Sequence, residues 1–575
     1  MVQVEKIIEH LISKGFDCQE IDFCGSEAIA IRLEIATRRF ELIHFPEKEI
    51  TALPVFLLAN PNEVGQLAHV LNTEINGVKL GSVCVNDRDS VSVNFNMPLL
   101  AIEESLKRHV VILTKSIIDS DWNRRELLRE FKSCWLSVCD FDSRPILLTN
   151  DSGKLEEIDV YRPLKERQIG VQSYYLAQSK DSDLSEIAKI YWRDNSERSL
   201  AGKAVVLPLT EIDPAPLEKN QLNEWYLNIL SKQEPDLFTK LKHSYGRWKT
   251  KEYWLFFNAE VPSGRVWFCL YFKSKTGKKH SLPLTKQQLS HWKVKAVPIR
   301  LFSKESVLPR GGANLDLATS KVALVGAGSV GGEIAHKLCA AGVQDLTIYD
   351  NDFYSIDNLY RHILPEEYLS LEKSYGLCFQ LKRQFLWSRT LASTKKLLDL
   401  RDQNLLSSYD LIAIAIGSPT HERIFKEYLL DKDIKVPVIN TWLEGFGVGG
   451  HAVLDLPDSE GCLLCAYVCP DTLTRGLSSN LNFIESNQNI TINMSGCGEQ
   501  FISYSAICSA QTALIASDLA IKYLEGRVKT SAKISWRGSD HDAKAHGIAL
   551  TNRFYHFKDS LLVKPLVHED CDACN

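Results

Sequence analysis

Residues 321–350 read KVALVGAGSVGGEIAHKLCAAGVQDLTIYD, and this stretch decides the fold class of the chain. Lys321–Val325 is a short apolar run, typical of a strand buried in a parallel sheet. Glu333–Ala341 has helical periodicity and precedes Gly342, a residue type that commonly ends helices. Asp345–Asp350 is a second strand-like run. The sequence therefore predicts a β-α-β unit and, with it, an α/β fold with a doubly wound sheet.

Three glycines stand between the predicted strand and helix. Gly326, Gly328 and Gly331 form G-x-G-x-x-G, which permits a tight turn and lets backbone N–H groups approach a phosphate. Asp350 ends the second strand 19 residues after Gly331, where a carboxylate can bind a ribose hydroxyl. The pattern predicts a nucleotide site, for NAD(P), FAD or ATP, with a purely structural glycine turn as the alternative.

The residues that follow narrow the choice of nucleotide. Residues 350–362 read DNDFYSIDNLYRH. This run resembles the adenylation domain of the ubiquitin-activating (E1), MoeB and ThiF superfamily, whose pattern is roughly D-x-D-x-V-x-x-S-N-L-x-R-Q. The resemblance extends over most of residues 315–575. It implies that the chain binds ATP with Mg²⁺ and adenylates a carboxylate.

The resemblance also implies roles for individual side chains. Adenylation spreads negative charge over the phosphates, so cations should converge on them. Arg361 and Lys373 are the cations expected to act in catalysis and in nucleotide binding. Asn358 would hydrogen-bond a phosphate oxygen and Asp350 the ribose, and Asp352 would also contribute to this site.

One family feature is missing from the sequence. The family usually has a magnesium-binding aspartate after the strand that corresponds to residues 409–417, where this chain has Gly417-Ser418. Asp352, Ser418 or mainly the phosphates themselves would then hold the metal. In dimeric relatives an arginine of the partner subunit reaches the ATP, which implies a homodimer and makes Arg310 a candidate.

Two cysteine pairs near the C-terminus have the spacing of metal ligands. They are Cys462–Cys465 and Cys571–Cys574, and four thiolates so spaced suit tetrahedral zinc. Family members carry a structural zinc at two matching pairs, which implies structural Zn²⁺ here. Two unrelated thiol pairs are the alternative, and Cys469 is a possible replacement for one ligand.

A further cysteine is a candidate nucleophile. Cys497 has a glycine on each side, which suits an exposed thiol that can attack an acyl adenylate. E1-like enzymes carry a thioester cysteine in this region. Cys508, on the apolar side of the predicted helix 506–523, is expected to be a core residue, but the choice between the two thiols stays open. MoeB-like enzymes work without such a thioester.

The N-terminal segment has a different pattern. A short amphipathic helix precedes strands at Ala28–Ile35 and Arg39–Phe45, and Gly81-Ser-Val-Cys84 precedes a helix from about Pro98. This order resembles the ubiquitin-conjugating (E2) α+β fold over roughly residues 1–115 and implies a second thioester on Cys84, with a buried, inert thiol as the alternative. The family's His-Pro-Asn signature is absent upstream, so its oxyanion asparagine is unassigned, with candidates Asn72, Asn76 and Asn86.

The middle of the chain is predicted to be ordered. Six of the 11 tryptophans lie between Trp192 and Trp292, which excludes a disordered linker. We therefore predict three domains: an E2-like domain (1–115), a mixed α+β connecting domain (116–310) and an adenylation domain with the zinc site (311–575).

Composition excludes several classes of protein. The 575 residues carry a formal net charge of −5, without the basic excess of a general nucleic-acid binder, so no direct nucleic-acid partner is expected. Apolar runs such as Leu411–Ile416 are far shorter than the ~20 residues of a membrane span. The odd number of cysteines, 15, argues against a secreted disulfide scaffold, and no signal peptide is recognisable, so a cytoplasmic protein is expected.

The order of the segments resembles the E1–E2 fusion proteins of bacterial antiphage CBASS operons. That resemblance implies a cGAS-like nucleotidyltransferase as the acyl donor and amines of target proteins as acceptors, with a ubiquitin-like protein as the alternative donor. Two other functions stay open. One is a MoeB/ThiF-type adenylyltransferase that activates a sulfur carrier, and the other is a non-catalytic module that binds a nucleotide and a partner.

Overall fold

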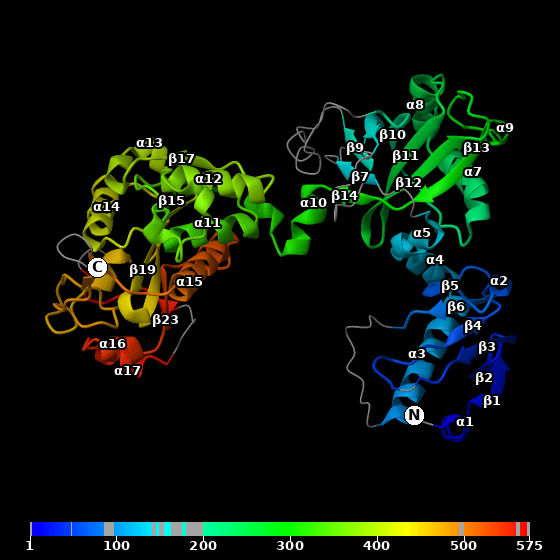
Figure 1. Ribbon diagram of the computed structural model, residues 1–575, viewed down its shortest axis with the longest axis horizontal. Coiled ribbons are helices and arrows are strands. Elements are labelled where there is room, and N and C mark those ends of the chain that lie inside the picture. Colours follow the sequence, from blue (N-terminus) through cyan, green and yellow to red (C-terminus); the bar gives the residue numbers. More distant parts are fainter. Residues whose placement is uncertain are drawn as a thin grey trace. The chain divides into compact units, whose positions relative to one another are not determined.

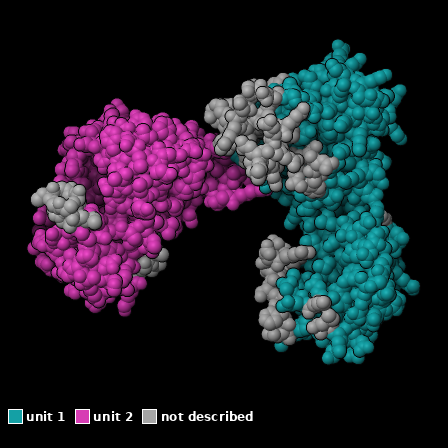
Figure 2. Space-filling model, in the orientation of Figure 1, with its two compact units in different colours: residues 1–303 teal, residues 304–575 magenta. Residues whose placement is uncertain are grey.

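The computed structural model describes residues 3–47, 49–85, 97–140, 145–148, 154–162, 175–179, 199–493, 500–558 and 564–571. The chain forms two compact units, residues 1–303 and 304–575 (Figures 1 and 2). The division into three domains stays a prediction. Within the described ranges, no helix is long and apolar enough to cross a membrane.

The first part of unit 1 is an antiparallel sheet of order β1-β2-β3-β4-β6-β5, covered by helices α1 and α3. The predicted N-terminal helix and the two predicted strands are confirmed as α1, β2 and β3. Apolar side chains of both helices, such as Leu11 and Leu106, are fully buried against the sheet. The elements are α1 (Val4–Ser13), β1 (Asp17–Phe23), β2 (Ser26–Ile35), β3 (Arg38–His44), β4 (Leu57–Ala59), α2 (Pro61–Val64), β5 (Val70–Ile75), β6 (Val78–Val83) and α3 (Pro98–Ile118).

The second part of unit 1 is a mixed sheet of order β13-β12-β11-β10-β8-β9-β7-β14. Its core is aromatic, with Trp135, Trp225 and Phe268 in mutual ring contact, so the prediction of an ordered segment is confirmed here. The strands are β7 (Pro145–Leu148), β8 (Glu156–Tyr161), β9 (Tyr175–Ser179), β10 (Lys203–Leu209), β11 (Glu252–Val261), β12 (Gly264–Ser274), β13 (Trp292–Val297) and β14 (Arg300–Phe302). The helices are α4 (Ser120–Arg129), α5 (Phe131–Val138), α7 (Leu222–Lys232), α8 (Pro235–Tyr245) and α9 (Lys286–Leu289).

Unit 2 contains the predicted doubly wound sheet. Its order is β17-β16-β15-β18-β19-β20-β23-β24, and the first five of these strands are parallel. The strands are β15 (Lys321–Val325), β16 (Asp345–Tyr349), β17 (Leu391–Ser393), β18 (Leu411–Ile414), β19 (Val438–Glu444), β20 (Gly449–Asp455), β23 (Ala532–Arg537) and β24 (Lys564–Pro565). The chain runs from β15 to β16 on one side and later to β18 on the other. Ligands of such sheets bind at this switch point, beyond the carboxyl ends of the strands.

Helices flank this sheet, and α11 and α15 share one hydrophobic core with it (Figure 1). The predicted β-α-β unit is confirmed as β15-α11-β16, and Gly342 ends α11 in the left-handed conformation, with φ 117°. The helices are α10 (Lys304–Val307), α11 (Ser329–Ala341), α12 (Lys373–Gln384), α13 (Gln403–Leu406), α14 (Pro419–Asp431), α15 (Ala506–Leu524), α16 (His541–Ala545) and α17 (Asn552–His556).

Candidate nucleotide site and reactive thiols

The three glycines of the loop after β15 face different surroundings. Gly326 has φ 97°, and a Cβ there would lie 2.6 Å from the carbonyl oxygen of Ala415. A Cβ on Gly331 would overlap the carbonyl oxygen of Gly326. A Cβ on Gly328 would meet nothing within 4 Å. The first and third glycines are thus required by the fold itself, whereas the second leaves open space beside the backbone.

That open space lies at the N-terminus of α11, whose N-cap residue is Gly328. The amino end of a 13-residue helix carries partial positive charge and N–H groups that lack intrahelical partners. A side chain at Gly328 would fill the position where a phosphate can approach these groups. The loop therefore fits the phosphates of a nucleotide.

Asp350 fixes the shape of the loop. One carboxylate oxygen accepts a hydrogen bond from the N–H of Ala327 at 2.6 Å, and the other accepts one from the N–H of Asp352 at 2.7 Å. Burial raises the pKa of Asp350 above its ordinary value. Each carboxylate oxygen has a further lone pair, so a ribose hydroxyl can still bind beside these backbone contacts.

His362 holds the same loop by a second contact. Its Nδ1 accepts the N–H of Leu364 at 3.1 Å, so Nε2 carries the proton and donates it to the carbonyl oxygen of Ala327 at 2.6 Å. Burial lowers the pKa of His362, which keeps the ring neutral. Sequence reasoning gave this residue no role, although it directly follows Arg361.

The predicted cations approach the site from two elements. Lys373, the first residue of α12, has its Nζ 3.2 Å from a carboxylate oxygen of Asp352. Its side chain is 13% exposed and that of Asp352 is 66% exposed. The guanidinium of Arg361 lies 5.2 Å from the ring centre of Tyr504, whose hydroxyl is 3.1 Å from the hydroxyl of Ser329. Tyr504 thus links Arg361 to the amino end of α11.

Asn358 has a local structural contact. Its side-chain oxygen accepts hydrogen bonds from the N–H and the hydroxyl of Ser355, both at 3.2 Å, which caps the short 3₁₀ helix Ile356–Asn358. The amide nitrogen is the group that remains for a phosphate oxygen, so the role predicted for Asn358 is compatible with this contact.

A carboxylate that sequence reasoning missed lies behind Gly417-Ser418. Glu422, in the first turn of α14, accepts the N–H of Ser418 at 3.2 Å and the side-chain amide of Asn440 at 3.3 Å. Burial raises the pKa of Glu422 to about 7. The hydroxyl of Ser418 lies 2.6 Å from Nδ1 of His421. Asp352, Ser418 and the phosphates are still the candidate ligands for magnesium.

Three of the four predicted zinc ligands lie together. The sulfur atoms of Cys462, Cys465 and Cys571 are all within 4.8 Å of one another, and all three residues are buried. A hydrogen bond from Cys462 lowers the pKa of the Cys465 thiol, which favours the thiolate that zinc binds. Cys574 lies outside the described residues. In the part of the chain that the structure describes, Cys469 does not belong to this thiol group.

Of the two candidate thiols for the first thioester, the structure describes only one. Cys497 lies outside the described residues. Cys508 is half-buried in the first turn of α15, with its sulfur 3.2 Å from the hydroxyl of Ser505. It packs on the core, as predicted, but also lines a cavity of about 350 Å³ with Arg537 and His541. The choice between the two thiols stays open.

Cys84 directly follows β6 and is exposed, which excludes the buried alternative. Its N–H donates a hydrogen bond to the carbonyl oxygen of His69 at 2.7 Å. Among the asparagines considered for oxyanion stabilisation, Asn72 lies in β5 and Asn76 in the turn to β6, whereas Asn86 is outside the described residues.

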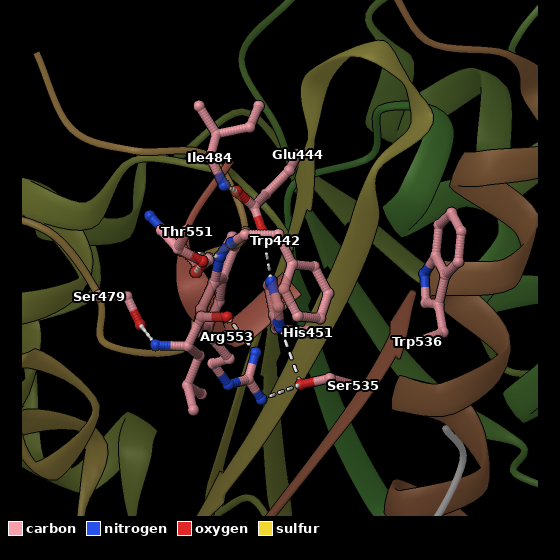
Figure 3. Close-up of polar contacts among 12 residues, drawn as sticks. Trp442, Glu444, His451, Ser479, Ile484, Ser535, Trp536, Thr551 and Arg553 are labelled. Atoms are coloured by element: carbon pink, nitrogen blue, oxygen red, sulfur yellow. Dashed lines mark hydrogen bonds and ion pairs between the residues drawn. The ribbon is translucent and has the colours of Figure 1, made fainter. Parts of the chain in front are cut away.

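A buried polar network lies between the sheet of unit 2 and its covering loops (Figure 3). His451 is 2.7 Å from a carboxylate oxygen of Glu444 and 2.8 Å from the hydroxyl of Ser535, and Arg553 reaches the same hydroxyl at 3.3 Å. The arrangement has the residue types of a hydrolase triad, but Glu444, His451 and Ser535 are all buried. Glu444 also accepts the backbone N–H groups of residues 483 and 484. The network therefore fastens loops to the sheet rather than meeting a substrate.

Comparison with known proteins places this site in a family context. Residues 302–544 match the ThiF family. Two relatives are described as "ATP-dependent ubiquitin transferase-like protein Cap2". The one from Escherichia coli is 27% identical over 39% of this chain and 37% of its own length, and the one from Vibrio cholerae is 24% identical over 43% and 42%. The "adenylyltransferase and sulfurtransferase UBA4" of Lodderomyces elongisporus is 25% identical over 29% and 37%.

The matched part of the chain thus spans about two fifths of these relatives. The matches show that residues 302–544 are similar to the ThiF family and that this chain shares sequence with the two Cap2 proteins at 24 to 27% identity. The ThiF-family match includes the glycine loop, Arg361 and Lys373, and it ends before the last cysteine pair.

Proposed function

We propose that unit 2 uses ATP and Mg²⁺ to adenylate the C-terminal carboxylate of a partner protein. The observation that carries this proposal is the open space at Gly328, at the amino end of α11, with Arg361 tied to that helix end through Tyr504. Lys373 stands beside Asp352 near the same loop. The location of all these residues inside the ThiF-family match supports the assignment.

The chemistry requires these residue types. A carboxylate oxygen attacks the α-phosphorus of ATP, an acyl–phosphate bond forms, and pyrophosphate leaves. The charge that develops on the phosphates is stabilised by Arg361, Lys373 and the N–H groups of the loop. Asp350 and His362 act indirectly, because they hold the carbonyl and N–H of Ala327 and thereby set the loop geometry.

The acyl group then moves through two thioesters. The Cys497 thiolate attacks the acyl carbon and releases AMP, and the Cys84 thiolate displaces Cys497 by thiol exchange. An amine of a target protein attacks the second thioester, releases the Cys84 thiolate and loses a proton, which leaves an isopeptide bond. The names of the two Cap2 relatives support a ubiquitin-transferase-like reaction of this kind.

The further parts of the proposal concern partners and metal. The acyl donor is a cGAS-like nucleotidyltransferase or a ubiquitin-like protein, the setting is cytoplasmic antiviral defence, and the active form is a homodimer through unit 2. The three clustered thiols and Cys574 hold a structural zinc ion that fastens the C-terminal segment. The E2-like character of residues 1–115 is part of this proposal.

The test is pyrophosphate release from ATP·Mg²⁺ on addition of a cGAS-like nucleotidyltransferase with an intact or a truncated C-terminus. We expect release only with the intact C-terminus. Release that ignores the C-terminus would contradict carboxylate adenylation. No release in either case would favour the non-catalytic nucleotide- and partner-binding module.

A second candidate function is activation of a sulfur carrier, which the match to the sulfurtransferase of Lodderomyces elongisporus favours. In that reaction the adenylated C-terminus ends as a thiocarboxylate. A product heavier than the donor by the replacement of one oxygen with sulfur, in the presence of a sulfur source, would identify this reaction by mass spectrometry.

A further inference from the structure

The β5–β6 hairpin ends at Cys84, beside ionisable side chains that the proposed relay does not use. Val70 pairs with Val83 in this antiparallel hairpin, so His69 and Cys84 are the next two residues to face each other. The hydrogen bond of 2.7 Å from the Cys84 N–H to the His69 carbonyl continues the ladder to this position. This hydrogen bond makes His69 and Cys84 direct neighbours across the hairpin.

His69 is held in an unusual backbone conformation. Its φ is 64°, in the left-handed region that a non-glycine residue adopts only when its surroundings enforce it. Glu130 provides that enforcement with both oxygens. One accepts the His69 backbone N–H at 3.0 Å, and the other lies 2.6 Å from Nδ1 of the ring. Glu130 therefore binds both the backbone and the side chain of His69.

Helices α3 and α4 and the residue between α4 and α5 supply charged groups around the His69 ring. Glu126 lies 3.9 Å from Nε2, and Arg129 is 3.5 Å from that same carboxylate. The ring of Trp122, 5.9 Å away between centroids, carries Lys115 on its face. The hydrogen bond to Glu130 raises the pKa of His69; burial and Arg129 oppose the rise, and Glu126 adds to it. The arrangement favours the imidazolium at pH values where a free histidine is mostly neutral.

We propose that His69 is a positioning residue for Cys84, which fixes the end of β6 through its carbonyl oxygen and places an imidazolium beside the thiolate. The inference rests on the proposed function in assigning a use to that thiolate. A cation beside a thiol favours the thiolate, which is both the attacking group in thiol exchange and the leaving group when an amine attacks. Glu130 acts one step further back, because it keeps His69 in place and protonated.

The pH dependence has a defined sign. The imidazolium is present below the raised pKa of His69 and is lost as the pH rises through that value. A cysteine is nucleophilic as its thiolate, which alkaline conditions favour. The reactive combination of imidazolium and thiolate therefore exists only in a limited range of pH. The upper limit of this range is the pH at which His69 loses its proton.

The test measures the rate at which iodoacetamide alkylates Cys84 in the full-length chain between pH 5.5 and 9.5, followed by mass spectrometry of the peptide that contains Cys84. His69→Asn is the main variant, because asparagine tolerates the left-handed conformation while lacking the charge. Glu130→Gln keeps an acceptor for the backbone N–H and removes the carboxylate. His10→Asn is the matched control, since His10 pairs with Glu103 at 2.8 Å on α1 and α3 instead of the hairpin.

We expect Cys84 in His69→Asn to be alkylated at pH 7 about fivefold more slowly than in wild type, because the cation beside the thiol is lost. Glu130→Gln should move the histidine-dependent inflection of the profile to lower pH, and His10→Asn should match wild type. A His69→Asn profile that superimposes on that of wild type would overturn the proposal. Should His69→Asn expose the buried Cys134 to the reagent, it has lost its fold, and the Glu130→Gln profile then decides: an unshifted inflection would overturn the proposal.

This readout needs neither ATP nor a donor, so its failure is separate from that of the proposed function. A shifted Cys84 profile in a chain that forms no thioester with any donor supports the positioning role and counts against the relay. Relay activity with an unshifted profile counts against the positioning role alone.

Discussion

The glycine loop of unit 2 and the hairpin end of unit 1 are built in opposite ways. The loop presents backbone: Gly326 turns, Gly331 lets helix and strand approach, and Gly328 leaves space for a phosphate. The hairpin end presents side chains, with Cys84 beside His69, and His69 is held by Glu130, which is 61 residues away in sequence. A backbone site depends on where side chains are absent, so a short local pattern reveals it. A side-chain site depends on partners that only the fold brings together.

The largest expected effect is the loss of adenylation when Arg361 is removed, because the backbone loop carries no full positive charge. Arg361→Ala should lower donor-dependent pyrophosphate release about 10³-fold, because a cation that stabilises charge in the transition state is worth about 4 kcal/mol. Both thioesters should disappear as well. Arg383→Ala, at an exposed arginine of α12 that pairs with Glu367, is the control and should retain normal activity. Retention of more than half the activity by Arg361→Ala would show that the loop alone suffices.

Two glycine substitutions distinguish the role of the loop in folding from its role in ATP binding. Gly331→Ala should reduce the free energy of unfolding of unit 2 by more than about 3 kcal/mol, since its Cβ would overlap the Gly326 carbonyl oxygen. Gly328→Ala should leave the unfolding transition in urea unchanged yet weaken ATP binding about tenfold, measured by titration calorimetry. Equal ATP affinity in Gly328→Ala and wild type would mean that no phosphate approaches this position.

The buried network of Figure 3 provides a test of how much contacts between side chains stabilise unit 2. His451→Ala leaves the buried Glu444 carboxylate without its ring partner and should cost about 3 kcal/mol in urea unfolding. His10→Ala breaks a histidine–glutamate pair in which Glu103 keeps a second partner, Lys107 at 2.6 Å, and it should cost less than about 1 kcal/mol. Equal costs for the two substitutions would show that burial does not set the strength of these pairs.

The last expected effect is a pH dependence of the stability, which arises at Glu422. Its folded-state pKa of about 7 lies above its ordinary value of 4.5, so the folded protein binds the proton more tightly than the unfolded chain does. The resulting stability is present below pH 4.5 and is lost as the pH rises to 7. Glu422→Gln should therefore be more stable than wild type by about 3 kcal/mol at pH 8 and equal to it at pH 4, because each pKa unit is worth about 1.4 kcal/mol. A stability difference that does not change with pH would contradict this account.

The parts of the molecule that the sequence predicted well are those determined by residues close together in the sequence. The β15-α11-β16 unit and the glycine that ends α11, Gly342, both follow from patterns of a few residues. The spacing within each cysteine pair indicated metal ligands, but the convergence of Cys462 and Cys571, which are 109 residues apart, was expected from a family resemblance.

The parts that sequence missed act through distant contacts. His362 binds a carbonyl 35 residues earlier in the chain, and Glu422 is identified only by the Ser418 and Asn440 groups that surround it. Glu422 belongs to no spacing pattern, and His362 stands at the last position of the quoted run, where the sequence assigned it no role. Their roles follow from which backbone groups the fold leaves within hydrogen-bonding distance, and that information is tertiary.

One measurement tests the central claim, an ATP-dependent relay between two thiols, most directly. The full-length chain, ATP·Mg²⁺ and a cGAS-like nucleotidyltransferase are resolved on a non-reducing gel as wild type, Cys497→Ala and Cys84→Ala. The relay predicts a thiol-sensitive conjugate that is absent in Cys497→Ala and present in Cys84→Ala, with amine-linked products only in wild type. A thiol-sensitive conjugate that persists in Cys497→Ala, or amine-linked products that persist in Cys84→Ala, would contradict it.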